Sequence, residues 1–372
     1  MKYPIAKPQI DEEEEKLVLE VLRSGALSIG SKIEEFEKKF AELVGSPYAC
    51  AVSSGTAGLH LALIACGVKE GDEVITSPFS FIASANAILY VGAKPVFADI
   101  DPLTFNIDSK EVEKKITSKT KAILPVHIFG QSCDMHPIIE LASRRNLKVV
   151  EDACESIAAE HKNQKVGTFG DAAVFSFYPN KQMTTGEGGI IVTSDKKIDS
   201  LCRSLRNQGR SENRQWLDHE RLGYNYRMHE LSAAIGVAQL KKLPKIIEER
   251  RKIAALYSEE LKKHADLVSS PQVHPRNTHS WFVYVARINN SAIDRDKVIE
   301  KLTEIGIATK PYLPSIHLFD FYRRSFGFKE GDFPVSEAAS DSSIALPFYI
   351  GLEKSDIEYI CQKLAEVLKN SL

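Results

Sequence analysis

The chain has 372 residues, of which 43% are hydrophobic and 26% are charged, and its formal net charge at pH 7 is −2. This composition is typical of a globular protein with room for two domains, and the small net charge gives no electrostatic reason to expect a nucleic-acid or membrane partner. No apolar run approaches the roughly 20 residues of a membrane helix. Residues 1–8 are too few and too polar for a signal peptide, so we expect a cytoplasmic protein.

The cysteines and histidines give no sign of a disulfide framework or a metal centre. The six cysteines are scattered and form no CxxC pair, which favours reduced thiols and agrees with a cytoplasmic location. The ten histidines show no metal-ligand spacing, so we expect no metal site.

Two helices are predicted first, one over residues 9–24 with Asp11 as its N-cap, and one from Ser31, where Glu34 completes a capping box. Short apolar strands then alternate with helices, which predicts an α/β fold whose buried, mostly parallel sheet carries helices on both faces. The strands are predicted at residues 49–53, 73–77, 95–98, 122–126, 147–151, 172–177 and 189–193. The helices are predicted at residues 56–66, 82–91, 109–116, 135–145 and 196–206.

The second half of the chain changes character after a polar loop at residues 207–218. Helices are predicted at 229–241 and 245–264, separated by Leu243-Pro244, because proline disfavours a helix interior. The remainder has the pattern of an α+β unit, with strands at 280–288 and before Tyr312 and helices at 295–305 and 354–368. We therefore predict a large domain at 1–245, with a helical arm at 1–30, and a small α+β domain at 246–372.

One lysine occupies an unusual position between two predicted core strands. Pro179 ends the strand at 172–177, and Lys181 follows it before a turn rich in glycine and threonine. A loop lysine is usually solvated. Beside a core of low dielectric constant, however, its amine loses charge more easily and becomes a usable nucleophile.

Three other segments deliver polar or aromatic side chains past strand ends, where open α/β sheets bind ligands. Residues 53–58 open a helix and carry Gly55 and Thr56, which suits a phosphate, although helix capping alone explains such residues. Asp152 ends an apolar strand, where a carboxylate is costly to bury without a partner. It is predicted to act either as a helix cap or as the counter-ion of a cationic ring. Phe79 and Phe81 follow a third strand, where Phe79 is expected in the core.

A phosphate cradle, an aromatic ring, a counter-ion and a lysine together indicate pyridoxal 5′-phosphate (PLP). Its aldehyde forms a Schiff base with a lysine, and an aspartate keeps its pyridine nitrogen protonated. Residues 6–8, 22–25, 53–59, 151–153, 170–189 and 222–228 also match a known pattern. Through these motifs the sequence resembles, nearly end to end, the DegT/StrS-type nucleotide-sugar aminotransferases, which have the aspartate-aminotransferase fold (fold type I).

The resemblance implies a role for particular residues. Lys181 would hold PLP and act in catalysis, Asp152 would pair with the ring nitrogen, and Glu155 would lie beside the ring hydroxyl. The remaining cofactor contacts would come from Gly55, Thr56, Ala57, Phe81, Ser176 and, across a homodimer interface, Asn225. The sugar side would be lined by Tyr312 and His317, with Arg227 and Lys310 as candidate cations for a diphosphate.

Some positions depart from the family pattern. Ala26 stands where many relatives carry Trp or Tyr, Gly30-Ser31 replaces Gly-Pro, and Glu155 stands where Gln or His is common. A carboxylate near a phenolate is electrostatically unfavourable, so we expect Glu155 to be protonated or turned away. These departures concern substrate contacts rather than the cofactor.

The resemblance implies a ping-pong transamination from L-glutamate to a keto-sugar carried on a nucleoside diphosphate. Similarity of the turn at residues 180–189 to perosamine synthases favours a 4-keto-6-deoxy sugar. Sugar dehydratases of the same family replace the lysine with histidine, whereas this chain keeps Lys181. A non-catalytic regulator that binds PLP or sugar is the alternative, and an α/β binding module without cofactor would be colourless.

Overall fold

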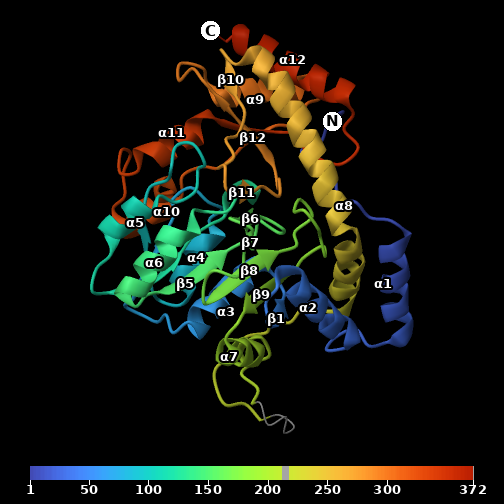
Figure 1. Cartoon of the computed structure of the whole chain (residues 1–372), viewed down its shortest axis with the longest axis vertical. Coiled ribbons are helices and arrows are strands. Elements are labelled where there is room, and N and C mark those ends of the chain that lie inside the picture. Colours follow the sequence, from blue (N-terminus) through green and yellow to red (C-terminus); the bar gives the residue numbers. More distant parts are fainter. Residues whose placement is uncertain (212–217, 372) are drawn as a thin grey trace.

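The structure is a computed structural model that describes residues 1–211 and 218–371. Its centre is a sheet of seven strands in the order β1-β9-β8-β5-β4-β2-β3 (Figure 1). β9 runs antiparallel to both of its neighbours, and the other adjacent pairs are parallel, as predicted for a mostly parallel mixed sheet. The strands are β1 (Tyr48–Val52), β2 (Glu73–Thr76), β3 (Lys94–Phe97), β4 (Thr120–Leu124), β5 (Lys148–Asp152), β8 (Ala172–Ser176) and β9 (Gly189–Thr193).

Helices cover both faces of this sheet, as the apolar runs predict. Successive side chains of a strand point to opposite faces, so Val174 packs into one core cluster and Phe175 into another. One face is covered by α3 (Gly55–Ala65), α4 (Ala83–Tyr90) and α7 (Lys196–Arg206). The other is covered by α2 (Ser31–Val44), α5 (Ser109–Lys115), α6 (Met135–Arg145) and the first half of α8 (Glu230–Leu261), against which α1 (Glu12–Ser24) packs.

Two smaller sheets lie outside the central one. An antiparallel sheet contains β10 (Val268–Ser269), β12 (Tyr284–Ile288), β14 (Ser343–Leu346) and β13 (Lys310–Pro311), and its core includes α9 (Arg295–Glu304), α12 (Lys354–Lys369) and the second half of α8. A three-stranded sheet joins β11 (Asn277–Thr278) to β6 (Glu160–His161) and β7 (Gln164–Lys165). The sequence did not predict β6, β7, β10, β11 and β14, nor the helices α10 (Asp320–Phe326) and α11 (Pro334–Ser342).

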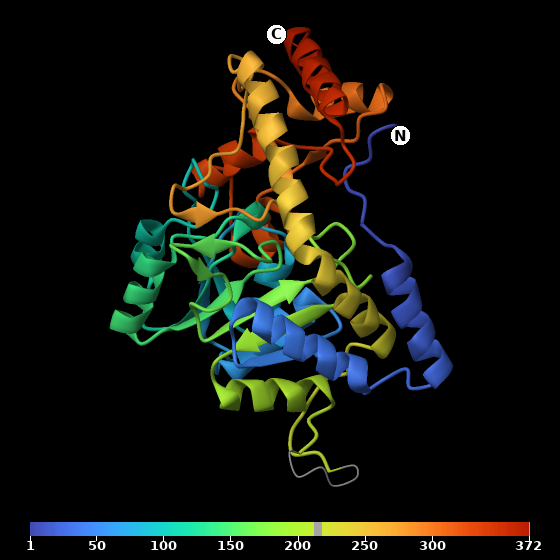
Figure 2. The ribbon, with the colours of Figure 1, turned by 45° about the vertical axis from the view of Figure 1, so that its right-hand side comes forward.

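The predicted break at Leu243-Pro244 is wrong, because α8 is one continuous helix from Glu230 to Leu261. Pro244 itself is exposed, whereas Leu243, Ile246 and Ile247 beside it are buried. Proline in a helix interior costs about 3 kcal/mol, and burying three large aliphatic side chains returns more than that. Figures 1 and 2 show α8 running from the central sheet to the small antiparallel sheet. The predicted boundary at 245/246 falls inside this helix, and the domain division stays a prediction.

Part of the predicted loop at 207–218 lies outside the described residues. Its described ends pair with later segments, Asn207 with Asn225 and Arg210 with His219. Among the helices of the described ranges, none has both the length and the apolar character that crossing a membrane requires.

The predicted capping box at Ser31 is also wrong. Ser31 is the first residue of α2, and Gly30 occupies the N-cap position. The carboxylate of Glu230, on α8, instead accepts hydrogen bonds from the backbone N–H groups of Gly30, Lys32 and Ile33 at 2.9, 2.8 and 3.1 Å. A Cβ atom on Gly30 would lie 2.8 Å from this carboxylate, which explains the glycine. A distant acidic side chain therefore supplies the cap and fixes α2 to α8.

We predict that Glu230→Ala lowers the free energy of unfolding by about 2–4 kcal/mol, because it removes the cap and leaves N–H donors without an acceptor. Urea unfolding measures the change. Glu248→Ala, at an exposed site on the same helix, is the matched control and should change stability by less than about 0.5 kcal/mol. Equal effects of the two substitutions would show that Glu230 is not the cap.

Candidate active site

The carboxyl ends of β1, β2, β5 and β8 meet at one edge of the central sheet and border a cavity of about 400 Å³. Eight of the residues singled out in the sequence line it: Gly55, Thr56, Phe81, Asp152, Glu155, Ser176, Lys181 and Tyr312. Seven of them end or follow strands of the central sheet, which bring them together because those strands all end on the same side. Tyr312 instead follows β13 of the small antiparallel sheet.

One end of the cavity is formed by the start of α3. Ser54 is the N-cap, and its Oγ accepts the N–H of Ala57 at 3.1 Å, so capping accounts for part of this motif. Gly55 lies so close to its neighbours that a Cβ atom would be 2.9 Å from both Cys154 Sγ and Ser176 Cβ. The start of α3, with the positive end of its helix dipole, therefore borders the cavity at a position too crowded for a Cβ atom.

Asp152 lies at the end of β5 and is 5% exposed. Its Oδ2 accepts a hydrogen bond from Ser84 Oγ at 2.6 Å, and its Oδ1 accepts the N–H of Cys154 at 3.2 Å. Ser84 in turn contacts Ser80 Oγ at 2.7 Å. The sequence did not predict that these two serines support Asp152, because their spacing gives no sign of a contact with β5. A buried carboxylate on the cavity wall suits a cationic ligand.

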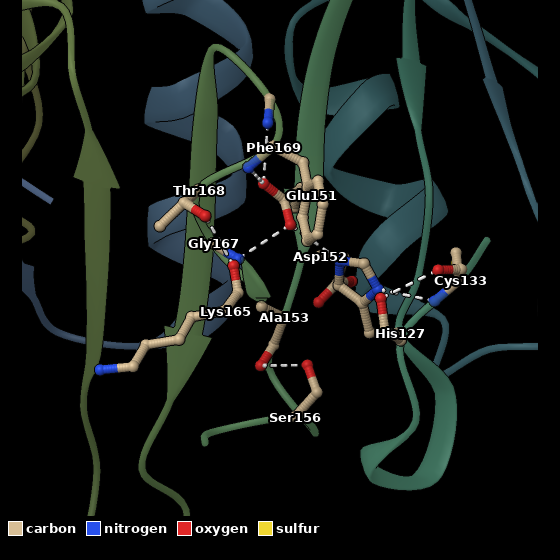
Figure 3. A network of polar contacts seen from close by, with 12 residues as sticks. His127, Cys133, Glu151, Asp152, Ala153, Ser156, Lys165, Gly167, Thr168 and Phe169 are labelled. Atoms are coloured by element: carbon tan, nitrogen blue, oxygen red, sulfur yellow. Dashed lines mark hydrogen bonds and ion pairs between the residues drawn. The ribbon is translucent and has the colours of Figure 1, made fainter. Parts of the chain in front are cut away.

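The residue before it, Glu151, points to the opposite side of β5 and is fully buried (Figure 3). Its carboxylate accepts the backbone N–H groups of Gly167, Phe169 and Gly170, each at 2.8 Å, and contacts His127 Nε2 at 3.0 Å. Because His127 Nδ1 accepts the N–H of Cys133, its Nε2 carries the proton that is donated to Glu151. This network holds the strand end from which Asp152 faces the cavity. Sequence reasoning missed it, although an acidic residue in an apolar strand is itself a signal.

Lys181 lies in the loop between β8 and β9, and its side chain is only 12% exposed. Its Nζ is 3.4 Å from Glu155 Oε1 and 3.9 Å from the centre of the Phe282 ring. Lys181 is thus held in the cavity rather than solvated. Phe282 was not foreseen, because it comes from the C-terminal half of the chain and only the tertiary fold brings it here.

Glu155 is 7% exposed, and its Oε2 accepts the N–H of Phe129 at 2.9 Å. Burial raises the pKa of this carboxyl group, and the nearby charge of Lys181 partly opposes the rise. Burial likewise raises the pKa of Tyr312, which therefore stays a neutral phenol at the cavity wall. Phe81 is 62% exposed at the cavity, whereas Phe79 lies in the core as expected.

Four predicted substrate or interface residues do not line this cavity. His317 is fully buried, with Nε2 2.9 Å from Glu337 Oε1. Arg227 donates to Asn207 Oδ1 at 2.9 Å, and both Asn225 and Lys310 are exposed. Their roles stay predictions.

Comparison with known proteins assigns this chain to a family. The model of the DegT/DnrJ/EryC1/StrS aminotransferase family matches residues 8–365. The chain belongs to this family.

Individual proteins are similar to this chain over nearly its whole length. The chain is 40% identical to a GDP-perosamine synthase of Caulobacter vibrioides, with 99% of this chain and 98% of the relative covered. It is 39% identical to a pleiotropic regulatory protein of Geobacillus stearothermophilus, with 99% and 97% covered. The PLP form of a candidate sugar aminotransferase from Streptococcus pneumoniae superposes with a TM-score of 0.94, at 27% identity and full coverage of both chains. The predicted family, fold, PLP cofactor and sugar-aminotransferase class are confirmed.

The cavity of this aminotransferase fits PLP. Gly55 lets the start of α3 pack closely against Cys154 and Ser176 at the end of the cavity that suits a phosphate, Asp152 offers a buried carboxylate to the ring nitrogen, and Lys181 offers an amine. We expect Thr56 and Ser176, which also line the cavity, to add hydroxyl groups at the phosphate end. When bound, PLP supplies the electron sink for the reaction.

The raised pKa of Glu155 predicts a pH effect on stability. The folded protein holds this proton more tightly than the unfolded chain, so its stability falls as pH rises from about 4.5 through the raised pKa. Glutamine does not titrate. The stability of Glu155→Gln relative to wild type should therefore increase over that window, as measured by thermal unfolding of PLP-free protein. Glu113→Gln, at an exposed position, is the control. A difference that stays constant or shrinks with pH would rule out a raised pKa.

Proposed function

We propose that this aminotransferase moves the amino group of L-glutamate to a keto-sugar carried on a nucleoside diphosphate, and that the sugar is a 4-keto-6-deoxy sugar. The observation that carries the proposal is the 40% identity, over nearly the whole of both chains, to a GDP-perosamine synthase. Such a product belongs to the synthesis of surface polysaccharides or other amino sugars.

The chain's own residues divide the work. Lys181 would hold the cofactor, and its free amine would move a proton between the α-carbon of the amino donor and the C4′ carbon of the cofactor. Asp152 keeps the ring nitrogen protonated, and its burial at 5% exposure strengthens that interaction. Glu155 reaches Lys181 Nζ across 3.4 Å, which suits a residue that keeps the freed amine near the reacting atoms. Tyr312 lines the same cavity, and we assign it to the sugar substrate.

We further propose that the protein acts as a cytoplasmic homodimer whose sites are shared between subunits. Asn225 is exposed and does not line the cavity of its own chain, which supports a role in the neighbouring subunit's site. Arg227, two residues later, would reach the nucleotide diphosphate from the same segment. Lys310 and His317 remain candidates for the sugar nucleotide, Lys310 because it is exposed and His317 only through the family resemblance.

A second candidate function is a regulator that binds PLP or sugar without turnover. The 39% identity to a pleiotropic regulatory protein favours it. The retained Lys181, Asp152 and Ser176 argue for catalysis, and a half-reaction with glutamate distinguishes the two, because a regulator of this kind would leave the bound PLP unchanged.

The test is a panel of nucleoside-diphosphate keto-sugars that differ in keto position and nucleotide, each incubated with L-glutamate. We expect the fastest amination with a 4-keto-6-deoxy sugar. Lys181→Ala should abolish turnover, a loss of at least about 10⁴-fold, while the protein stays folded. Lys196→Ala, at an exposed helix start, is the control and should keep full activity. Normal turnover by Lys181→Ala would refute its role, and a preference for 3-keto sugars would refute the proposed substrate.

Mixing two inactive variants tests the shared site. If Asn225 acts in the partner's site, a heterodimer of Lys181→Ala and Asn225→Ala chains contains one intact site. Equal co-expression should then restore about one quarter of wild-type activity, because half of the dimers are mixed and each has one working site of two. Residual activity equal to the mean of the two variants alone would place Asn225 outside the neighbouring site.

A further inference from the structure

A cluster of metal-ligating side chains lies apart from the PLP cavity, where the start of α6 meets β6. Asp134, His136 and His161 each offer one ligand atom, and these atoms all lie within 4.8 Å of one another. None of the three lines the PLP cavity. His161 is fully buried, whereas Asp134 and His136 are exposed, so the cluster is open to solvent on one side.

The orientation of His161 is fixed by Asn277. Asn277 Nδ2 donates to the carbonyl of Ser132 at 2.7 Å, which turns its Oδ1 towards His161. That oxygen only accepts, so His161 Nδ1, at 2.6 Å, carries the proton. In the neutral ring, Nε2 is therefore an acceptor, and it is buried without a hydrogen-bond partner.

His161 Nε2 faces Asp134 Oδ1 at 3.2 Å. A ring lone pair and a carboxylate oxygen at this distance repel each other unless a cation lies between them. Either a proton or a metal ion satisfies this requirement. The convergence of His136 as a third ligand favours a metal ion, because a shared proton needs only two partners.

Asp134 is not explained as a helix cap. It occupies the N-cap position of α6, where an aspartate normally accepts a backbone N–H, yet its side chain makes no capping hydrogen bond. Its carboxylate is turned towards His161 instead. Asp134 therefore contacts His161 instead of capping α6.

We propose that Asp134, His136 and His161 bind a divalent transition-metal ion such as Zn²⁺, with solvent completing its coordination. Two imidazoles and one carboxylate suit Zn²⁺, Co²⁺ or Ni²⁺ and disfavour Ca²⁺ and Mg²⁺, which prefer oxygen ligands. The bond from His161 Nδ1 to Asn277 is the outer-shell contact that metal-bound histidines characteristically make.

The metal ion would have a structural role, cross-linking two segments of the fold, rather than a catalytic one. It would join β6 to the start of α6, and through Asn277 it would reach β11 as well. No metal site is predicted from the sequence, because most of α6 and all of β5 lie between His136 and His161 and the three residues form no recognisable spacing.

Holoenzyme without a histidine tag is titrated with Co²⁺ and followed by visible absorption, and its thermal unfolding is measured with and without Zn²⁺. We expect one ion per chain, and an increase in Tm of about 2–5 °C at a hundredfold excess over Kd. His136→Gln, a change at an exposed position, should weaken Co²⁺ binding at least tenfold and reduce the Tm shift at the same Zn²⁺ concentration to about half or less, while leaving aminotransferase activity unchanged.

Asp134→Asn should weaken binding in the same way. His274→Gln is the matched control, because the His274 ring lies 5.7 Å from that of His161 but is not one of the three ligands; it should bind like wild type. Absence of Co²⁺ binding at millimolar concentration would overturn the proposal and leave a proton as the bridging cation. Binding that His136→Gln and Asp134→Asn do not weaken would overturn it as well, by placing the ion elsewhere.

Discussion

The carboxylate of Asp152 is kept out of water at the end of β5 and receives two hydrogen bonds, from Ser84 and Cys154. A buried carboxylate with so few donors is costly unless a cation completes its surroundings, and the cavity beside it has room for one. PLP, with its protonated ring nitrogen, meets this requirement. The strand end must therefore be rigid enough to hold the charge in place before the cofactor arrives.

That rigidity comes from Glu151, which points the other way. Three backbone N–H groups and His127 converge on its carboxylate, so the segment at 167–170 is fixed to β5. Two adjacent acidic residues thus act on opposite faces of one strand. The Glu151 carboxylate has its hydrogen bonds within the protein, whereas the Asp152 carboxylate can still accept a bond from a ligand. Their surroundings differ because successive side chains of a strand point to opposite faces.

Buried carboxylates recur as anchors between distant segments. Glu230 caps α2 from α8, and Asp99 accepts the N–H groups of Val335 and Ser336 at the start of α11. Each replaces a local cap with a long-range one, so the helix starts are tied to the rest of the fold. Asp134 differs from these residues, because its carboxylate is exposed at the N-cap of its own helix and faces His161 instead of accepting a backbone N–H.

The order of strands and helices, the mostly parallel sheet and the positions of Gly55, Thr56, Asp152 and Lys181 at strand ends followed from local patterns of the sequence. Glu155, Ser176 and Tyr312 followed only from the resemblance to a known family. The continuity of α8 through Pro244, the cap from Glu230, and the contacts of Ser84, Glu151 and Phe282 followed from neither. Only the tertiary structure decided them, because each depends on a partner far along the chain. Packing on both sides of a proline, or a carboxylate arriving from another helix, outweighs the local preference that the sequence displays.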